Sequence, residues 1–371
     1  MVTTQDITPS QHAKLTRDLK TRTRDLAKRF VFEAGQLTGM SRVLGQRYRG
    51  RGSVFMFHEI TTDRDDRLGM GCTVADFGAT LSRIRASGYD FVSLAEAKQR
   101  LETGDGRPFV ALTFDDGYRD NIELALPVME RFEAPATIFV PTQMATREIN
   151  AWWLAIRELV TLNSFVDVEP LSQSFVCETR AEKLATYWHL IDWIWQDFRR
   201  ADALSDVFER YGISMPDLVD RHAMDPAAVR QADQHHLIEI AAHTTSHRAL
   251  ATLSDAEALS EMVDNKRWLE NLLGRDVPHF AYPYGRPAIS GDREARLARK
   301  AGFNMALTTD PGSLFAEHAQ FHNTHLWPRE NGEFSSSVRA GVSWSLNGTW
   351  AAAKTRFGSP LVNISAADAA E

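Results

Sequence analysis

Short apolar runs alternate with helically spaced apolar residues through the first part of the chain. An apolar run at residues 54–58 predicts a strand, and the apolar spacing over Val74–Ala86 predicts a helix. A second run at residues 91–93 predicts a short strand, which a helix over residues 94–101 follows. Repeated strand and helix units of this kind favour an α/β fold built on a parallel sheet.

A further apolar run, residues 109–112, leads towards two adjacent carboxylates, Asp115 and Asp116. A turn at a strand end can bring both side chains into one site, and Gly117 permits the tight backbone that this needs. The two acids can then divide metal binding and proton transfer between them, if their surroundings separate their pKa values. An Asx-type turn is the alternative explanation of the same residues.

A second predicted strand end carries two histidines. Residues 238–242 form the apolar run, and His243 and His247 follow it with a spacing of four. If the chain turns helical at Thr244, both imidazoles lie on one side of a turn and can share a cation with a carboxylate such as Asp116. Helix capping by the Thr and Ser residues between the histidines is the alternative.

The third strand end, residues 280–287, breaks into a turn that contains Pro and Gly. Alone, this segment is only a loop signal. Three strand ends that each carry polar or turn residues, in a chain with repeated strand and helix patterning, are how an α/β barrel builds a site. The three segments are therefore expected to meet.

These strand-end segments resemble the motifs of the polysaccharide deacetylase family, carbohydrate esterase family 4 with its NodB-homology domain. Thr-Phe-Asp-Asp-Gly at residues 113–117 resembles the first motif, His-Thr-x-x-His at 243–247 the second, and Tyr-Pro-Tyr-Gly at 282–285 the third. The resemblance extends from about residue 52 to residue 329. It implies a distorted (β/α) barrel with fewer than the usual eight complete units.

The resemblance also implies a role for each motif residue. Asp116, His243 and His247 would bind a divalent metal, zinc first, although one carboxylate and two imidazoles also accept cobalt or nickel. Asp115 would be the general base that deprotonates the attacking water. The backbone N–H of Tyr284 would donate to the tetrahedral oxyanion.

The general acid has two candidates. In the commoner family layout it lies in a Leu-x-His motif near the end of the domain, where this chain has His325 as a poor match. A branch of the family takes it from an early strand with a Tyr-His segment, which residues 54–59 resemble. We therefore expect His58 to protonate the leaving amine. A histidine that only caps a buried strand is the alternative reading of His58.

A second departure from the commoner pattern concerns arginine. Many relatives begin the third motif with an Arg that pairs with the base, whereas this chain has Ala281 there. Arg329 and Arg286 could each supply the guanidinium instead. Arg329 is the expected one, because Leu-Trp-Pro-Arg resembles a recurrent segment of the branch that has this Ala. An exposed arginine after a proline turn is the alternative.

A long insertion at about residues 146–236 interrupts a predicted barrel domain over residues 53–330. The adjacent Trp152 and Trp153 are candidate sugar-binding platforms, because neighbouring bulky rings cannot both face one helical core. The tail, residues 331–371, is expected to be loop and frayed terminus. Apolar residues spaced by three or four predict a helix with a core-facing stripe in the insertion: Leu184, Trp188, Ile191, Trp195 and Phe198.

Charge is unevenly distributed along the chain. Residues 1–52 carry a net charge of +7, which leaves −14 on the rest because the whole chain carries −7. Helically spaced leucines among these charges predict a basic amphipathic helical extension, and residues 10–51 could contact anionic lipid as a peripheral segment. A helix that packs on the barrel or self-associates is the alternative.

Composition is consistent with an enzyme that has a large core. The chain has 371 residues, 43% of them apolar, and no run near the roughly 20 apolar residues that span a bilayer. The first residues lack the features of a secretory signal, so we expect a cytoplasmic protein. Part of it could lie peripherally at the inner face of the membrane. Cys72 and Cys177 form no disulfide framework, and a nucleic-acid partner is not expected because no docking module is recognisable.

The sequence thus predicts a metal-dependent hydrolase that removes an N-acyl group, most simply acetyl, from an amino sugar in a glycan, oligosaccharide or glycolipid precursor. Two alternatives stay open. A small-molecule amidase or deformylase could use the same scaffold, because the family resemblance fixes the attacked bond better than the molecule that carries it. A catalytically idle glycan-binding barrel is the second alternative.

Overall fold

The computed structural model describes residues 45–63, 68–334 and 338–364. Eight of its strands form one sheet in the order β11-β10-β9-β6-β5-β1-β12, with β4 beside β5, and the pairings in this sheet are parallel. The strands are β1 (Gly52–Phe57), β4 (Asp90–Phe91), β5 (Phe109–Phe114), β6 (Ala136–Val140), β9 (Ile238–Ala242), β10 (His279–Ala281), β11 (Met305–Leu307) and β12 (Glu330–Asn331). The predicted α/β class and parallel sheet are confirmed.

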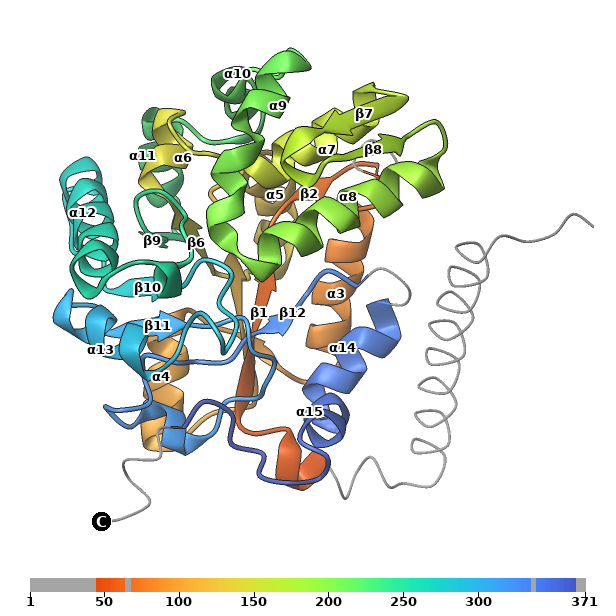
Figure 1. Ribbon diagram of the computed structural model, residues 1–371. Helices are drawn as coiled ribbons and strands as arrows, with labels where there is room; N and C mark the ends of the chain where they lie inside the picture. The colour runs from red at the N-terminus through yellow and green to blue at the C-terminus, as the bar shows by residue number, and fades with distance from the viewer. Residues whose placement is uncertain (1–44, 64–67, 335–337, 365–371) are drawn as a thin grey trace, which may run out of the picture.

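Helices connect these strands and cover the outside of the curled sheet (Figure 1). The helix predicted over Val74–Ala86 is α3, and its first turn is capped by Thr73, whose side chain accepts from the backbone N–H of Asp76. The remaining barrel helices are α4 (Leu94–Thr103), the π-helix η2 (Asn121–Ala125), α5 (Leu126–Phe132), α12 (Asp255–Leu273) and α13 (Asp292–Lys300).

The sheet curls into an incomplete barrel. Its two edge strands, β11 and β12, do not pair with each other, and the chain between them adds only isolated bridges, from Trp327 to Leu307 and from Leu314 to Gly52. Inward-facing apolar side chains fill the interior, among them Val54, Phe139 and Trp327, all fully buried. The expected distorted (β/α) barrel with fewer than eight complete units is therefore confirmed.

The predicted insertion is a layer of its own, gathered at the top of the view in Figure 1. It has a separate apolar core, in which Leu190 and Ile194 of α8 are fully buried. The predicted stripe is right for Ile191 but wrong for Trp188, which is 46% exposed because α8 turns its 187, 190 and 194 positions inward instead. Its elements are α6 (Thr142–Thr146), α7 (Trp152–Leu162), β7 (Phe165–Val168), η3 (Glu169–Leu171), β8 (Gln173–Val176), α8 (Arg180–Gln196), η4 (Phe198–Leu204), α9 (Ser205–Arg210), α10 (Met215–His222) and α11 (Pro226–Asp233).

The segment after Arg329 is not the loop that its sequence suggests. It contributes β12 and two helices, α14 (Val338–Leu346) and α15 (Thr349–Lys354). α14 packs on α3 and buries Val342 in the core, which a frayed terminus could not do. The interspersed Ser and Ala residues concealed this helix from the sequence pattern.

Most of the predicted basic extension lies outside the described residues, so the amphipathic helix and its lipid contact stay predictions. The division of the chain into domains also stays a prediction. The described part of it packs on the end of the chain: Tyr48 contacts Ala351 and Ala352, and its hydroxyl donates to the carbonyl of Gly358 at 2.9 Å. Within the described ranges, no helix combines the length and the apolar character that crossing a bilayer requires.

Candidate active site

The candidate residues lie at one end of the sheet. His58 follows β1, Asp115 and Asp116 follow β5, and the His243 and Tyr284 segments follow β9 and β10. Because these strands are parallel neighbours, their carboxyl ends share one edge of the barrel. The three motifs and His58 are therefore brought together, as the sequence predicts.

The loops that carry the candidate residues have an unusual backbone. Asp116, Thr244, His247 and Tyr284 all have positive φ angles, between 57° and 72°. Residues with a Cβ rarely adopt this left-handed region, and each such residue costs on the order of 1–3 kcal/mol. The concentration of this strain at one end of the barrel marks a functional site, because the surrounding structure must hold these residues in place.

Asp116, His243 and His247 form a compact set of three buried ligands. Asp116 Oδ1 lies 3.2 Å from His247 Nε2 and 3.6 Å from His243 Nε2. One donor atom from each residue lies within 4.8 Å of the others. The Nδ1 of His243 is 2.7 Å from the carbonyl of Ala281, which fixes the proton on Nδ1 and leaves the Nε2 lone pair towards Asp116.

This donor set fits a divalent transition metal. Three protein ligands of the oxygen and imidazole type, with a second-shell carbonyl on one imidazole, are typical of catalytic zinc sites. Burial alone would raise the pKa of Asp116, but the two imidazoles outweigh it and hold that pKa well below its usual range. Burial lowers the pKa of His247, so the neutral, ligating form of its ring is favoured.

The histidine loop is not helical, contrary to the expectation at Thr244. Residues 243–249 run as an irregular loop, and the left-handed backbone at Thr244 and His247 turns both rings to the same side. α12 holds this loop in place: Asn265 Oδ1 accepts from the His243 N–H at 2.8 Å, and Glu261 accepts from the N–H groups of Thr245 and Ser246. Sequence spacing found the ligands but not the backbone that presents them.

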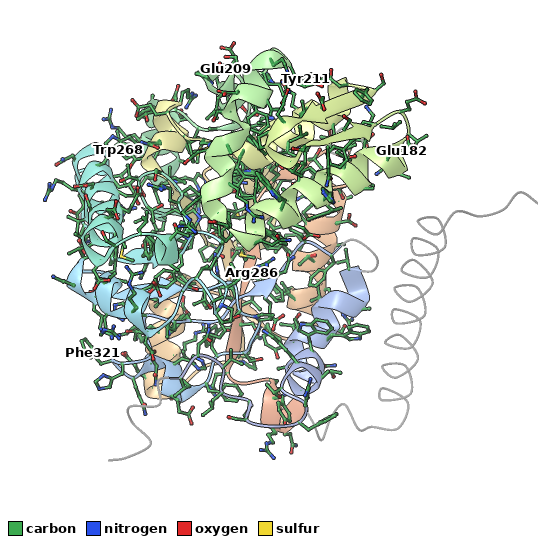
Figure 2. The ribbon with its side chains drawn as sticks, viewed as in Figure 1. Glu182, Glu209, Tyr211, Trp268, Arg286 and Phe321 are labelled. Carbon is green, nitrogen blue, oxygen red and sulfur yellow. The ribbon has the colours of Figure 1, made fainter. Side chains whose placement is uncertain are left out.

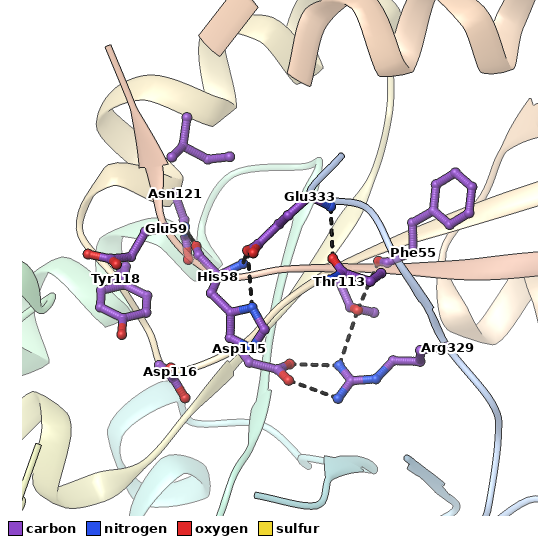
Figure 3. A network of polar contacts seen from close by, with 12 residues as sticks. Phe55, His58, Glu59, Thr113, Asp115, Asp116, Tyr118, Asn121, Arg329 and Glu333 are labelled. Carbon is purple, nitrogen blue, oxygen red and sulfur yellow. Dashed lines mark hydrogen bonds and ion pairs between the residues drawn. The ribbon is translucent and has the colours of Figure 1, made fainter. Parts of the chain in front are cut away.

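Asp115 is paired with Arg329, as expected. The guanidinium donates to both carboxylate oxygens, at 2.7 and 2.8 Å (Figure 3), and also to the carbonyl of Thr308. The Arg329 side chain is fully buried. Although burial opposes ionisation, the charge of Arg329, followed by that of His243, lowers the pKa of Asp115.

The other arginine candidate lies elsewhere. Arg286, near the centre of Figure 2, stacks over the ring of Trp195 in the insertion, 3.8 Å from the ring centroid. Within the described ranges, Asp115 forms its ion pair with Arg329 and none with Arg286. Of the two arginines that the sequence offered as partners of Asp115, the structure therefore pairs Arg329 with it and places Arg286 on Trp195.

His58 is held by Glu333, a residue that sequence reasoning missed. One carboxylate oxygen accepts from the backbone N–H of His58 at 2.8 Å and lies 3.1 Å from its Nδ1 (Figure 3). Burial disfavours the imidazolium, but the charge of Glu333 and its hydrogen bond outweigh this and raise the pKa of His58 to about 10. Nothing in the sequence around Glu333 marks it, because its partner is 275 positions away.

The alternative acid, His325, lies in another part of the barrel. Its Nε2 is 2.8 Å from the carbonyl of Phe303, just before β11, and its Nδ1 is 3.0 Å from the hydroxyl of Thr324. Both ring nitrogens of His325 therefore have hydrogen-bond partners. The residue lies at the opposite end of the strands from Asp115. Of the two candidate histidines, His58 is the one that lies at the same end of the strands as Asp115.

The backbone N–H of Tyr284 lacks a hydrogen-bond acceptor among the described residues. Thr309 fixes its loop, because the Thr309 hydroxyl donates to the carbonyl of Tyr284 and the Thr309 N–H to that of Gly285. A side chain at position 285 would collide with the Thr309 nitrogen, so a glycine is required there. The loop thus offers a fixed N–H donor beside the ligand set, as the sequence predicts.

Comparison with known proteins agrees with this geometry. The family model described as polysaccharide deacetylase matches residues 103–306, more than half of the 371 residues. The chain belongs to the polysaccharide deacetylase family. Among curated members of this kind, YxkH of Bacillus subtilis (strain 168), a protein named for polysaccharide deacetylation, is 22% identical over 284 residues, 75% of this chain and 72% of that protein.

Solved deacetylase structures share the fold of this family member. The de-N-acetylase from Aggregatibacter actinomycetemcomitans aligns with a TM-score of 0.51 at 12% identity, over 80% of this chain and 99% of that one. IcaB from Ammonifex degensii aligns with a TM-score of 0.50 at 15% identity, over 80% and 97%. At these identities the likeness concerns the fold, which agrees with the barrel described above.

Proposed function

We propose that this deacetylase-family protein is a metal-dependent hydrolase that removes an N-acyl group, acetyl in the simplest case, from an amino sugar of a glycan or glycolipid precursor. The observation that carries the proposal is the meeting of three units at one end of the sheet. A ligand set (Asp116, His243, His247), a carboxylate paired with arginine (Asp115) and an imidazole paired with glutamate (His58) lie together.

The ligand set supports metal dependence. A carboxylate and two imidazoles fit zinc, and they also accept cobalt or nickel. When bound, a divalent cation supplies Lewis-acid chemistry and lowers the pKa of water towards about 7. Asp116 and the two histidines are the residues that would hold it.

Asp115 is the general base in this proposal. Its lowered pKa keeps the carboxylate ionised at neutral pH, so it can accept the proton of an attacking water. The bidentate contact with Arg329 fixes the plane of the carboxylate. The pairing also separates the roles of the two adjacent acids, because Asp115 faces arginine while Asp116 faces the histidines.

His58 is the general acid in this proposal. Glu333 holds Nδ1, which leaves Nε2 as the nitrogen that can protonate the leaving amine. The raised pKa keeps the ring charged before that step. The N–H of Tyr284 is the donor for the oxyanion that develops on the acyl oxygen, a preorganised contact that needs no movement during the reaction.

Acetate release from N-acetylated oligosaccharides and lipid-linked amino sugars tests the proposal, with zinc-loaded protein beside Asp115→Asn. We expect release by the wild-type protein that is lost on metal chelation and in the variant. Release from small N-acyl compounds at the same rate as from sugars would instead favour a small-molecule amidase. Metal-loaded protein that releases no acyl group from any amide would favour an idle glycan-binding barrel.

A further inference from the structure

Two adjacent tryptophans of the insertion contact the candidate active site, because each indole N–H donates to a tyrosine hydroxyl there. Trp152 Nε1 donates to the phenol oxygen of Tyr284 at 3.0 Å, and Trp153 Nε1 donates to that of Tyr118 at 2.7 Å. Trp152 is only 4% exposed, so the expectation that its ring is an open sugar platform is wrong. The indoles instead fix the positions of two tyrosine hydroxyls beside the metal ligands.

The ring of Tyr284 is held from several sides. It stacks on Trp152 with 6.1 Å between centroids, and the rings of Phe198 and His247 lie at 4.4 and 4.8 Å. Ring packing of this kind, together with the indole hydrogen bond, leaves the phenol little freedom. The Tyr284 hydroxyl is therefore a fixed group next to the ligand His247.

The proton of the Tyr284 hydroxyl is available to another molecule. A phenol has one O–H donor, and the indole occupies only an acceptor position. No acceptor for this proton is recorded among the side chains and backbone atoms that the structure describes.

Tyr284 lines a small cavity of about 40 Å³, together with Asn150, Trp152, Phe198, Asp202 and His247. Two buried polar atoms of lining residues have no partner within the described ranges, Asn150 Oδ1 and His247 Nδ1. The Asn150 amide nitrogen donates to Asp202 Oδ1 at 3.0 Å, and because a carboxylate only accepts, this contact assigns the free amide atom as oxygen.

The lining is thus complementary to a hydroxyl group. Tyr284 O–H is a donor without an acceptor, and Asn150 Oδ1 is an acceptor without a donor. One hydroxyl can accept from the first and donate to the second. A cavity needs about 10–15 Å³ to hold one water, so 40 Å³ is enough space for a hydroxyl or hydroxymethyl group.

We propose that this cavity recognises one unsubstituted hydroxyl-bearing group of the amino sugar, with Tyr284 O–H as donor, Asn150 Oδ1 as acceptor and Trp152 as the positioning residue for Tyr284. The proposal rests on the proposed deacetylase function and specifies its substrate further. A sugar that carries a bulky substituent at this position, or lacks the hydroxyl, is a poor substrate. The insertion thereby acts as a selectivity element through the indole hydrogen bond of Trp152.

The test compares N-acetylglucosamine oligomers with analogues that lack single ring hydroxyls, using wild-type protein and Tyr284→Phe. We expect Tyr284→Phe to lower kcat/KM about 3- to 10-fold on the parent, the worth of one neutral hydrogen bond, and to have no effect on one analogue. That analogue should itself be poorer for the wild-type protein, a measurement that needs no variant. A melting curve of Tyr284→Phe checks its fold.

Tyr118→Phe is the matched control. It removes the other indole-bound hydroxyl, which does not line the cavity, so any loss should be the same for all sugars. If Tyr284→Phe lowers kcat/KM equally on the parent and on every analogue, the cavity does not recognise a hydroxyl and this inference is wrong. The proposed deacetylase function would be unaffected by that result. If the wild-type protein releases no acyl group from any amino sugar, both proposals fall.

Discussion

The strand-end loops of the barrel and the insertion that covers them are built from different kinds of residue. The loops hold buried acids and histidines on a strained backbone, as at Asp116 and His247. The insertion meets them with aromatic rings and a buried ion pair in which Arg157 donates to both oxygens of Glu59, the neighbour of His58. The difference indicates that reactive groups and the groups that hold them come from separate parts of the chain.

The largest effects should come from the loops. Asp115→Asn keeps the shape of the side chain but removes the base, so we expect turnover to fall about 10²- to 10⁴-fold with bound metal retained. His243→Ala removes a ligand and should lose both metal and turnover. Elemental analysis beside acetate release measures the pair. Wild-type turnover in Asp115→Asn would contradict the assignment of the base.

Substitutions of paired charges in the insertion should change the free energy of unfolding. Arg157 and Glu59 are about nine-tenths buried, and removing one partner leaves a buried charge, so Arg157→Ala should lower the free energy of unfolding by about 3–5 kcal/mol. Arg221→Ala, which breaks a more exposed pair with Glu158 in the same layer, should cost about 1 kcal/mol or less. Urea denaturation compares them. Equal changes would show that burial of the Glu59 pair does not matter.

A buried acid on the barrel side gives a pH dependence of stability. Burial raises the pKa of Glu330 from its ordinary 4.5 to about 7. The folded state therefore binds the Glu330 proton more tightly than the unfolded state does. The contribution of protonated Glu330 to the free energy of unfolding is fully present below pH 4.5 and is lost as the pH rises to about 7. The change amounts to about 3 kcal/mol.

Glu330→Gln removes this ionisation and tests the effect. The variant should be more stable than the wild-type protein at pH 8, and the gap should close below pH 5. Thermal or urea unfolding across this range measures it. A gap that is constant with pH would show that Glu330 titrates normally.

The smallest effect should come from the contact between the C-terminal segment and His58. Glu333→Gln removes the charge that raises the pKa of His58, and the acid must be protonated to act. The alkaline limb of kcat/KM should therefore move down by about one pH unit or more. His58→Ala, the control, should lose that limb altogether and slow release of the amine. An unmoved limb in Glu333→Gln would return the acid role to another group.

The sequence predicted the fold and the candidate residues well where chemistry leaves a local signal. Asp115, Asp116, His243 and His247 stand in short recognisable segments, and the alternation of strands and helices indicated the parallel sheet. The choice of Arg329 over Arg286 followed from the resemblance, and the structure shows its contact with Asp115. Their catalytic roles stay proposals.

What the sequence did not show depends on distance along the chain. Asn265 holds His243 through one hydrogen bond to its backbone N–H, and Glu333 contacts both the backbone N–H and the ring of His58. The residues around Asn265 and Glu333 in the sequence do not indicate these distant partners. The helical turn considered at Thr244 does not form, and the left-handed residues that present the two histidines instead leave no signal in apolar spacing. The platform role predicted for Trp152 was wrong for a similar reason, because its partner Tyr284 lies in another loop, whereas that of Trp153 stays a prediction.

The origin of Arg329 and Glu333 has a consequence for how the enzyme is made. The proposed base, Asp115, and the proposed acid, His58, are paired with residues 214 and 275 positions later in the chain, whereas the three candidate metal ligands are complete by residue 247. Chains emerge from the ribosome N-terminus first. A growing or truncated chain can thus possess every ligand for a cation while its proton-transfer groups still lack their partners, and catalytic competence arrives only when the last strand docks beside the first.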